Sequence, residues 1–99
     1  MIKKNEILEI LEENRKDIRL FGVKRIGVFG SFVRGASTTK SDIDILIEFH
    51  PGKKTFDHYM DLKVFLEKKF HRKVDLVVQE ALKPRVRSSI LKEIRYAGL

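Results

Sequence analysis

Cysteine is absent from this chain of 99 residues, and proline occurs only at Pro51 and Pro84. The lack of cysteine excludes disulfide bonds, a thiol nucleophile and zinc sites built on thiolates. Long apolar runs are also missing, because no stretch approaches the ~20 residues that a membrane-spanning helix needs. The N-terminal MIKKNEILEILEENRK interrupts its apolar positions with charge, so we expect neither a signal peptide nor a membrane anchor. These absences predict a soluble, cytoplasmic protein.

The composition is that of one folded domain with a basic surface. Hydrophobic residues make up 42% and charged residues 35% of the chain, enough to bury one modest core. Because repeats and linkers are lacking, we expect a single domain over residues 1–99. The formal net charge of +7 favours nucleotides, nucleic acid or an acidic protein as partners, or it serves solubility alone. Basic residues are spread from Lys3 to Arg95, which argues against a dedicated nucleic-acid surface.

Hydrophobic periodicity predicts a helix and three short strands. Asn5 can cap a helix over about residues 5–20, where apolar residues recur at helical spacing, and Gly22 follows its end. Apolar runs bounded by turn residues predict strands over residues 24–29, 43–49 and 74–78.

Two further helices are predicted in the second half of the chain. Thr55 or Asp57 can cap the first, and Pro84 suits the first turn of the second. In the first helix we expect a stripe of Tyr59, Leu62, Leu66 and Phe70 to face the core. The second helix should carry Val86, Ile90, Leu91 and Ile94 on one face. The order of elements indicates an α+β (α/β-like) fold, with a small sheet covered by helices.

Three aspartates stand at or inside the predicted strands. Asp42 and Asp44, two residues apart, should project from the same face, and Asp75 interrupts the third strand. Like charges held together need a compensating cation, and an oxygen-only donor set suits Mg²⁺ or Mn²⁺. Asp42 alone is compatible with ordinary turn chemistry after Ser41, but Asp44 and Asp75 are costly inside apolar strands unless they reach an ion. We therefore interpret the three aspartates as a metal-binding, catalytic set.

The segment GSFVRG, residues 30–35, follows the first strand and can form one helical turn. Free N–H groups there, with the Ser31 hydroxyl and the Arg34 guanidinium, could cradle a phosphate, although a Gly-Ser turn alone is more often only a turn. The segment is not a P-loop, because Ala36 stands where lysine is required. A phosphate cradle followed closely by metal-binding carboxylates is typical of sites that transfer a nucleotide with two metal ions.

These residues resemble the nucleotidyltransferases of the DNA polymerase beta superfamily, in which Gly-Ser precedes Asp-x-Asp and a third aspartate lies on a later strand. More narrowly, GSFVRG, SDIDILIEF and RKVDLV resemble the minimal nucleotidyltransferase (MNT) antitoxins, which are paired with HEPN-domain ribonuclease toxins. The resemblance covers roughly residues 20–95. It implies a small mixed sheet flanked by helices, and use of ATP with two Mg²⁺ ions. It further implies transfer of AMP to a tyrosine of a HEPN toxin.

Site residues follow from the resemblance position by position. It implies that Gly30 and Ser31 hold the triphosphate, with Arg34 near the phosphates. The metal ligands that it implies are Asp42, Asp44 and Asp75. The last of these would also help to deprotonate the acceptor. Since 99 residues suffice only for the catalytic core, the acceptor is expected on a partner protein.

Other functions remain open at this point. The main alternative is an antitoxin that neutralises its toxin by stoichiometric binding, with a dispensable active site. A basic nucleic-acid-binding domain rests on charge alone. The last helix offers a docking surface for an acidic partner, or simply a solvated face, through Arg85, Arg87, Lys92 and Arg95.

Overall fold

The fold is known from a computed structural model that describes residues 2–99. Its helices are α1 (Lys4–Glu13), α2 (Arg15–Leu20), α3 (Ser31–Arg34), α4 (Phe56–Phe70) and α5 (Pro84–Glu93), with a 3₁₀ turn, η1 (Gln79–Ala81). The strands are β1 (Val23–Phe29), β2 (Ile43–Phe49), β3 (Val74–Val78) and β4 (Arg95–Tyr96). The predicted bounds of the second and third strands are thus confirmed. Among residues 2–99, no helix is long and apolar enough to cross a membrane.

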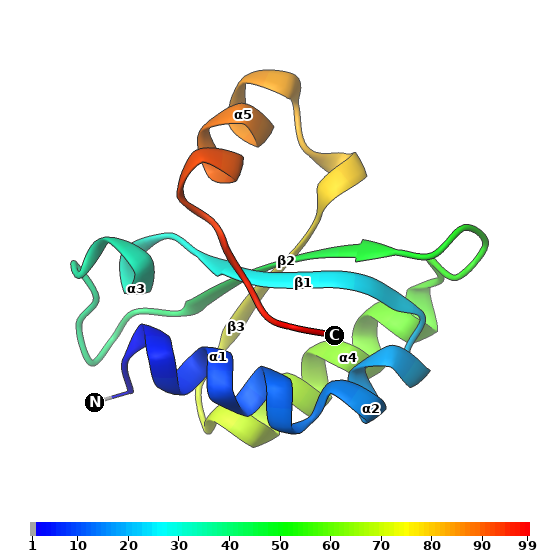
Figure 1. The fold of residues 1–99 in the computed structure, drawn as a ribbon, viewed down its shortest axis with the longest axis horizontal. Helices are drawn as coiled ribbons and strands as arrows, with labels where there is room; N and C mark the ends of the chain where they lie inside the picture. The colour runs from blue at the N-terminus through cyan, green and yellow to red at the C-terminus, as the bar shows by residue number, and fades with distance from the viewer. Residues whose placement is uncertain (1) are drawn as a thin grey trace.

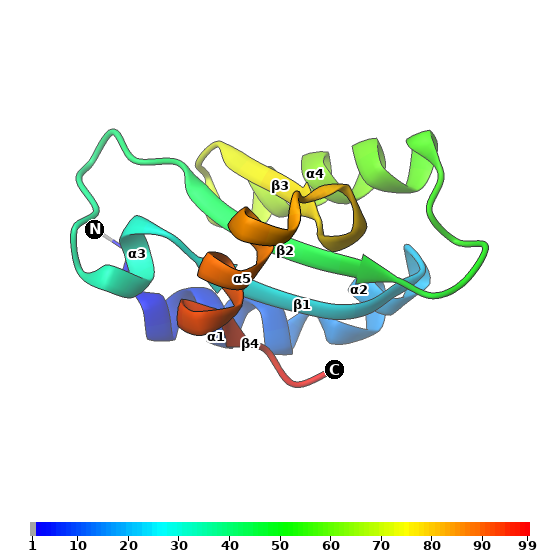
Figure 2. The same ribbon diagram turned by 90° about the horizontal axis from the view of Figure 1, so that it is seen from above.

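The four strands form one mixed sheet in the order β3-β2-β1-β4. β1 runs antiparallel to β2 and β4, whereas β2 and β3 are parallel and are connected through α4. Figure 1 shows α1, α2 and α4 on one face of the sheet and α5 on the other. Seen from above in Figure 2, α5 lies over β1 and β2. The predicted α+β class, with a small mixed sheet flanked by helices, is confirmed.

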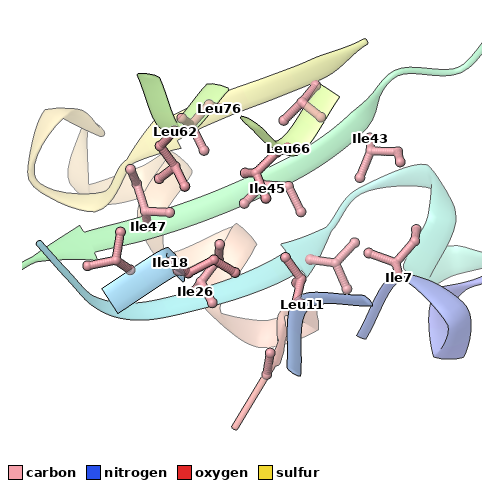
Figure 3. Close-up of a cluster of buried hydrophobic side chains, with 14 of the residues drawn as sticks. Ile7, Leu11, Ile18, Ile26, Ile43, Ile45, Ile47, Leu62, Leu66 and Leu76 are labelled. Carbon is pink, nitrogen blue, oxygen red and sulfur yellow. The ribbon is translucent and has the colours of Figure 1, made fainter. Parts of the chain in front are cut away.

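The alternation of side chains along β2 divides the core into two parts. On one face, Ile43, Ile45 and Ile47 join the larger cluster. Figure 3 shows these isoleucines between side chains of α4 and side chains of α1. On the other face, Leu46 packs in a smaller cluster with Phe29, Ile90 and Ile94. Asp44 lies on this second face, where a single helix covers the sheet.

The helix predicted over residues 5–20 is two helices that meet at Asn14. This residue leaves helical geometry at φ −104° and ψ 17°, and its side-chain Nδ2 donates to the Ile10 carbonyl at 2.8 Å. Asparagine side chains compete for backbone groups in this way, which explains the break. The predicted apolar face nevertheless continues across it, because Ile7, Leu11 and Ile18 are fully buried.

β4 is an element that the sequence pattern does not predict. The chain leaves α5 at Ile94, whose φ of −60° and ψ of 144° are extended. β4 then pairs with β1, setting Gly27 opposite Tyr96. A Cβ on Gly27 would lie 2.9 Å from the Arg95 carbonyl oxygen, so the glycine allows this close approach.

The buried face of α5 is narrower than predicted. Ile90 and Ile94 are buried as expected, whereas Val86 and Leu91 are 45% and 41% exposed. Only part of the predicted apolar face is therefore buried. A lone helix on an open sheet face contacts it along one stripe, and the flanking apolar residues stay in solvent.

α4 begins at the cap that its sequence suggests. The Thr55 hydroxyl accepts a hydrogen bond from the His58 N–H at 3.1 Å, so Thr55 rather than Asp57 is the cap. Tyr59 is half-buried, and its hydroxyl donates to the Leu76 carbonyl of β3. The remaining residues of the predicted stripe are all buried: Leu62, Leu66 and Phe70.

Two substitutions in α4 test this packing. Leu62 is fully buried, so Leu62→Ala should lower the free energy of unfolding by about 2–5 kcal/mol through the cavity it leaves. Val64, on the same helix, is 46% exposed, and Val64→Ala should change it by less than about 0.5 kcal/mol. Urea unfolding followed by circular dichroism measures both values. Equal losses would contradict the orientation of α4.

Candidate active site

The three aspartates lie together at the start of two neighbouring strands. Asp44 of β2 and Asp75 of β3 are direct partners in the parallel register. Asp44 is half-buried on the α5 face of the sheet, and Asp75 is exposed. Asp42 directly precedes the first residue of β2, and it is exposed. The strand register therefore brings together carboxylates that are 31 to 33 residues apart in the sequence.

Within this cluster, the pKa of Asp44 is strongly raised. Burial is the largest of the effects that raise the pKa of Asp44, to about 6 from the ordinary 3.8. The charge of Asp75, a hydrogen bond with the Asp75 carboxyl and the charge of Asp42 also raise this pKa, while Arg34 lowers it. The negative charge of the cluster is thus only partly compensated, so a cation would bind favourably here.

The donor set fits a hard divalent cation, because all three side chains offer carboxylate oxygens. Within residues 2–99, no three or more His, Cys, Asp or Glu side chains form a group that could hold a metal ion. The backbone therefore places Asp42, Asp44 and Asp75 side by side, and the side chains of Asp44 and Asp75 are in hydrogen-bond contact.

Gly30 joins β1 to α3 directly beside Asp44. Its φ of 79° lies in the left-handed region, and a Cβ built on it would overlap the Asp44 carboxylate. Only glycine satisfies both constraints. Ser31 follows as the first residue of α3 and is half-buried. The predicted helical turn after the Gly-Ser pair is therefore confirmed, and its backbone lies against the aspartate cluster.

Glu93, the last residue of α5, completes the surroundings of this turn. Its Oε1 accepts a hydrogen bond from the Gly30 N–H at 3.2 Å. The Arg34 guanidinium donates through Nη1 to both Glu93 carboxylate oxygens at 3.0 Å. Sequence reasoning missed Glu93, because an acidic residue at the end of an amphipathic helix carries no distinguishing signal.

Arg72 holds the loop that leads to Asp42. Its Nη1 donates to the carbonyl oxygens of Thr38, Thr39 and Ser41, at 3.4, 3.2 and 2.9 Å. Its guanidinium also lies 5.5 Å from the centre of the Phe32 ring. Sequence reasoning missed this residue too. Arg72 ties the end of α4 to the loop that positions the first aspartate.

Phe32 directly follows the Gly-Ser pair, within α3. Here the side chain is buried, 5% exposed, and belongs to the larger core cluster. α3 is thus anchored in the core by Phe32, and Arg34 is the arginine of this turn that reaches solvent, 57% exposed.

Comparison with known proteins points to one family. Residues 4–97 match the family model described as a nucleotidyltransferase domain. The protein adenylyltransferase MntA of Thermococcus cleftensis is 38% identical over 97 residues, which cover 97% of each chain.

Solved structures show the same likeness. One described as a minimal nucleotidyltransferase is 35% identical, has a TM-score of 0.74, and is matched over 89% of this chain and 93% of its own. A chain in the complex of the tri-AMPylated HEPN toxin of Shewanella oneidensis with its MNT antitoxin has a TM-score of 0.63 at 17% identity. That match covers 90% of this chain and 70% of the other, and it supports the fold.

Gly30 and Gly35 form a matched pair for testing the turn. Both have positive φ, 79° and 73°, but a Cβ on Gly35 would have no atom within 4 Å. Gly35→Ala should therefore cost about 1 kcal/mol of unfolding free energy, whereas Gly30→Ala, which also displaces Asp44, should cost about 3 kcal/mol. Chemical denaturation of both variants checks this. Similar losses would show that the turn does not lie against Asp44.

The raised pKa of Asp44 predicts how stability depends on pH. Because the folded state holds this proton up to about pH 6, the free energy of unfolding should fall as pH rises from about 4 to 6. Asn cannot carry the charge, so Asp44→Asn should be more stable than the parent by about 1 kcal/mol at neutral pH, after allowance for solvent screening.

Thermal unfolding in a buffer with chelator, at several pH values, tests this prediction. The difference between Asp44→Asn and the parent should shrink toward about pH 4. Asp61→Asn, which removes one exposed carboxylate of α4, is the matched control. A parent that is more stable than Asp44→Asn at neutral pH would contradict the charge repulsion.

Proposed function

Because the chain belongs to the nucleotidyltransferase domain family and is a nucleotidyltransferase, we propose that it transfers AMP from ATP to a tyrosine hydroxyl of a HEPN ribonuclease toxin. It would thereby act as the antitoxin of a toxin–antitoxin pair. The observation that carries this proposal is the Asp44–Asp75 pair beside the Gly30 turn. The proposal is supported by a relative, the protein adenylyltransferase MntA of Thermococcus cleftensis, and by a structural neighbour from the complex of the tri-AMPylated HEPN toxin of Shewanella oneidensis with MNT antitoxin.

We assign the triphosphate of ATP to the turn formed by Gly30 and Ser31. The N–H of Gly30 and the Arg34 guanidinium both already bind an anionic group, the Glu93 carboxylate. Guanidinium groups pair with phosphate oxygens in the same forked geometry that they use for carboxylates. The absence of a side chain at Gly30 lets the backbone come close to Asp44, and so sets the phosphates beside the aspartates.

We assign two Mg²⁺ ions to Asp42, Asp44 and Asp75. The fit rests on the oxygen-only donor set and on the raised pKa of Asp44, which is caused first by burial and then by the neighbouring charges of Asp75 and Asp42. When bound, Mg²⁺ lowers the pKa of the acceptor hydroxyl and neutralises the leaving pyrophosphate.

The reaction is a displacement at the α-phosphorus of ATP. The tyrosine oxygen forms a bond to this phosphorus, and the bond from the phosphorus to the pyrophosphate oxygen breaks. Asp75, which is exposed beside Asp44, would accept the tyrosine proton. The Gly30 N–H and Arg34 hold the charge that develops on the leaving group.

The toxin would dock on the outer side of α5, which covers the sheet face that carries Asp44. Arg87 is half-buried, with its Nη2 bonded to the Leu82 carbonyl at 3.1 Å, so it contributes less to this surface. Leu91 adds an exposed apolar contact. The exposed basic residues of this surface include Arg85 and Lys92 of α5, and exposed Arg95 follows in β4. A partner with acidic groups around its acceptor tyrosine complements this surface.

Neutralisation by stoichiometric binding is the second candidate function. The observation in its favour is the surface of α5, where exposed Arg85, Lys92 and Leu91 could contact a partner without the aspartates. It predicts that the toxin is silenced whether or not the aspartates can bind a metal.

One experiment separates the two functions. A HEPN-domain protein is incubated with this protein, ATP and Mg²⁺, and its intact mass is measured. We expect a gain of one or more AMP units. The double variant Asp42→Asn, Asp44→Asn should lose at least about a hundredfold in rate, because it removes carboxylates that hold the metal ions.

The controls make either result interpretable. Asp61→Asn and Asp57→Asn together remove two exposed carboxylates of α4, and transfer should continue at the parental rate. Peptide mapping then identifies the modified residue. Full transfer by the Asp42, Asp44 double variant would overturn the mechanism. An unmodified toxin that is nevertheless silenced in a stable complex would establish the binding function instead.

A further inference from the structure

The carboxylate of Glu93 occupies the groups to which we assign the triphosphate. It accepts from the Gly30 N–H at 3.2 Å and receives two contacts of 3.0 Å from the Arg34 guanidinium. Glu93 lies on α5, 63 residues beyond Gly30 in the sequence. The contact therefore exists only because α5 packs across the sheet and ends beside the turn between β1 and α3.

A carboxylate and a phosphate compete for such donors. Both present two or more oxygens to a planar guanidinium, and both accept from backbone N–H groups. The Gly30 N–H has one hydrogen to donate, so it cannot satisfy Glu93 and a phosphate oxygen fully at the same time. A phosphate bound here would also carry negative charge of the same sign as Glu93, which adds repulsion.

The exposure of the ion pair indicates how easily it opens. Arg34 and Glu93 are 57% and 25% exposed. Ion pairs in contact with solvent contribute little net stability, because water and salt screen them. Ile90 and Ile94 hold α5 on the sheet through the smaller core cluster, independently of Glu93. The pair is thus a weak anchor for the helix, and its loss would leave the helix packed.

We propose that Glu93 is a competitor of the nucleotide: it occupies Gly30 and Arg34 in the free chain and has to leave when a triphosphate binds. The inference rests on the proposed function, because it takes the phosphate site from it. Glu93 thereby sets the affinity for ATP. It also links nucleotide binding to the end of α5, since the displaced carboxylate belongs to the last residue of that helix.

Titration calorimetry with ATP and Mg²⁺ tests the competition. Glu93→Gln keeps the size of the side chain but removes its charge, and we expect ATP to bind about three- to tenfold more tightly. Glu93→Ala should show a change in the same direction. Glu80→Gln, which removes an exposed carboxylate of η1, is the matched control and should bind ATP like the parent. Weaker binding by both Glu93 variants, with parental binding by Glu80→Gln, would overturn the proposal.

A second measurement uses the unaltered chain and does not depend on how the variants fold. In NMR spectra, inorganic pyrophosphate with Mg²⁺ should shift the amide of Gly30 and the side-chain carboxyl carbon of Glu93 along the same titration curve. A shift at Gly30 with an unchanged Glu93 carboxyl would show that phosphate binds without displacing Glu93, and would overturn the inference alone.

Failure of the proposed function and failure of the competition by Glu93 give different results. If AMP transfer is absent but Glu93→Gln still tightens ATP binding, the competition stands and the transfer reaction does not. If neither ATP nor pyrophosphate binds to the parent or to Glu93→Gln, both the competition and the nucleotide site are wrong.

Discussion

Two like charges, fixed side by side by the register of two parallel strands, are the constraint around which this fold is arranged. Asp44 and Asp75 are set opposite one another by the same pairing that aligns the apolar residues of β2 and β3. A one-residue slip that moved them apart would also turn the isoleucines of β2 away from the larger core cluster. Hydrophobic packing therefore holds the two carboxylates together, and burial, followed by the charge of Asp75, raises the pKa of Asp44. Gly30 lacks a side chain because the Asp44 carboxylate fills the space where one would lie.

Much of the fold was predictable because its information is local. Apolar runs bounded by turn residues located β2 and β3 at their observed bounds, and the Thr55 cap located the start of α4. The break at Asn14 and the strand β4 were not predictable in the same way. Asn14 acts through a single side-chain bond to Ile10 that does not disturb the apolar period. β4 has two residues and forms because Gly27, far away in the sequence, leaves room for it.

In the candidate site, too, some residues could be predicted from local sequence and others could not. Asp44 and Asp75 stand out because a carboxylate inside an apolar strand is costly, and that anomaly is visible in the sequence alone. Glu93 and Arg72 are ordinary residues for a helix end and a loop, and nothing local distinguishes them. Their roles come from contacts that span 59 and 63 residues for Glu93 and 31 to 34 residues for Arg72. Such contacts arise from the packing of α5 and α4 on the sheet, which periodicity does not specify.

The two halves of the site differ in how their charge is compensated in the free chain. The positive half, the Gly30 N–H and Arg34, is already satisfied by Glu93. The negative half, the three aspartates, has Arg34 as the cation that lowers the pKa of Asp44, and this cation is shared with Glu93. A metal ion would therefore supply positive charge that the aspartates lack. A triphosphate would instead replace the negative charge of Glu93 at Gly30 and Arg34. Under the proposed function, metal binding would relieve the repulsion among the aspartates that the strand register holds together. Nucleotide binding would be opposed by the Glu93 carboxylate. Since a triphosphate would add oxygen ligands for Mg²⁺ beside the aspartates, the metal ion and the nucleotide would bind more favourably together than either alone.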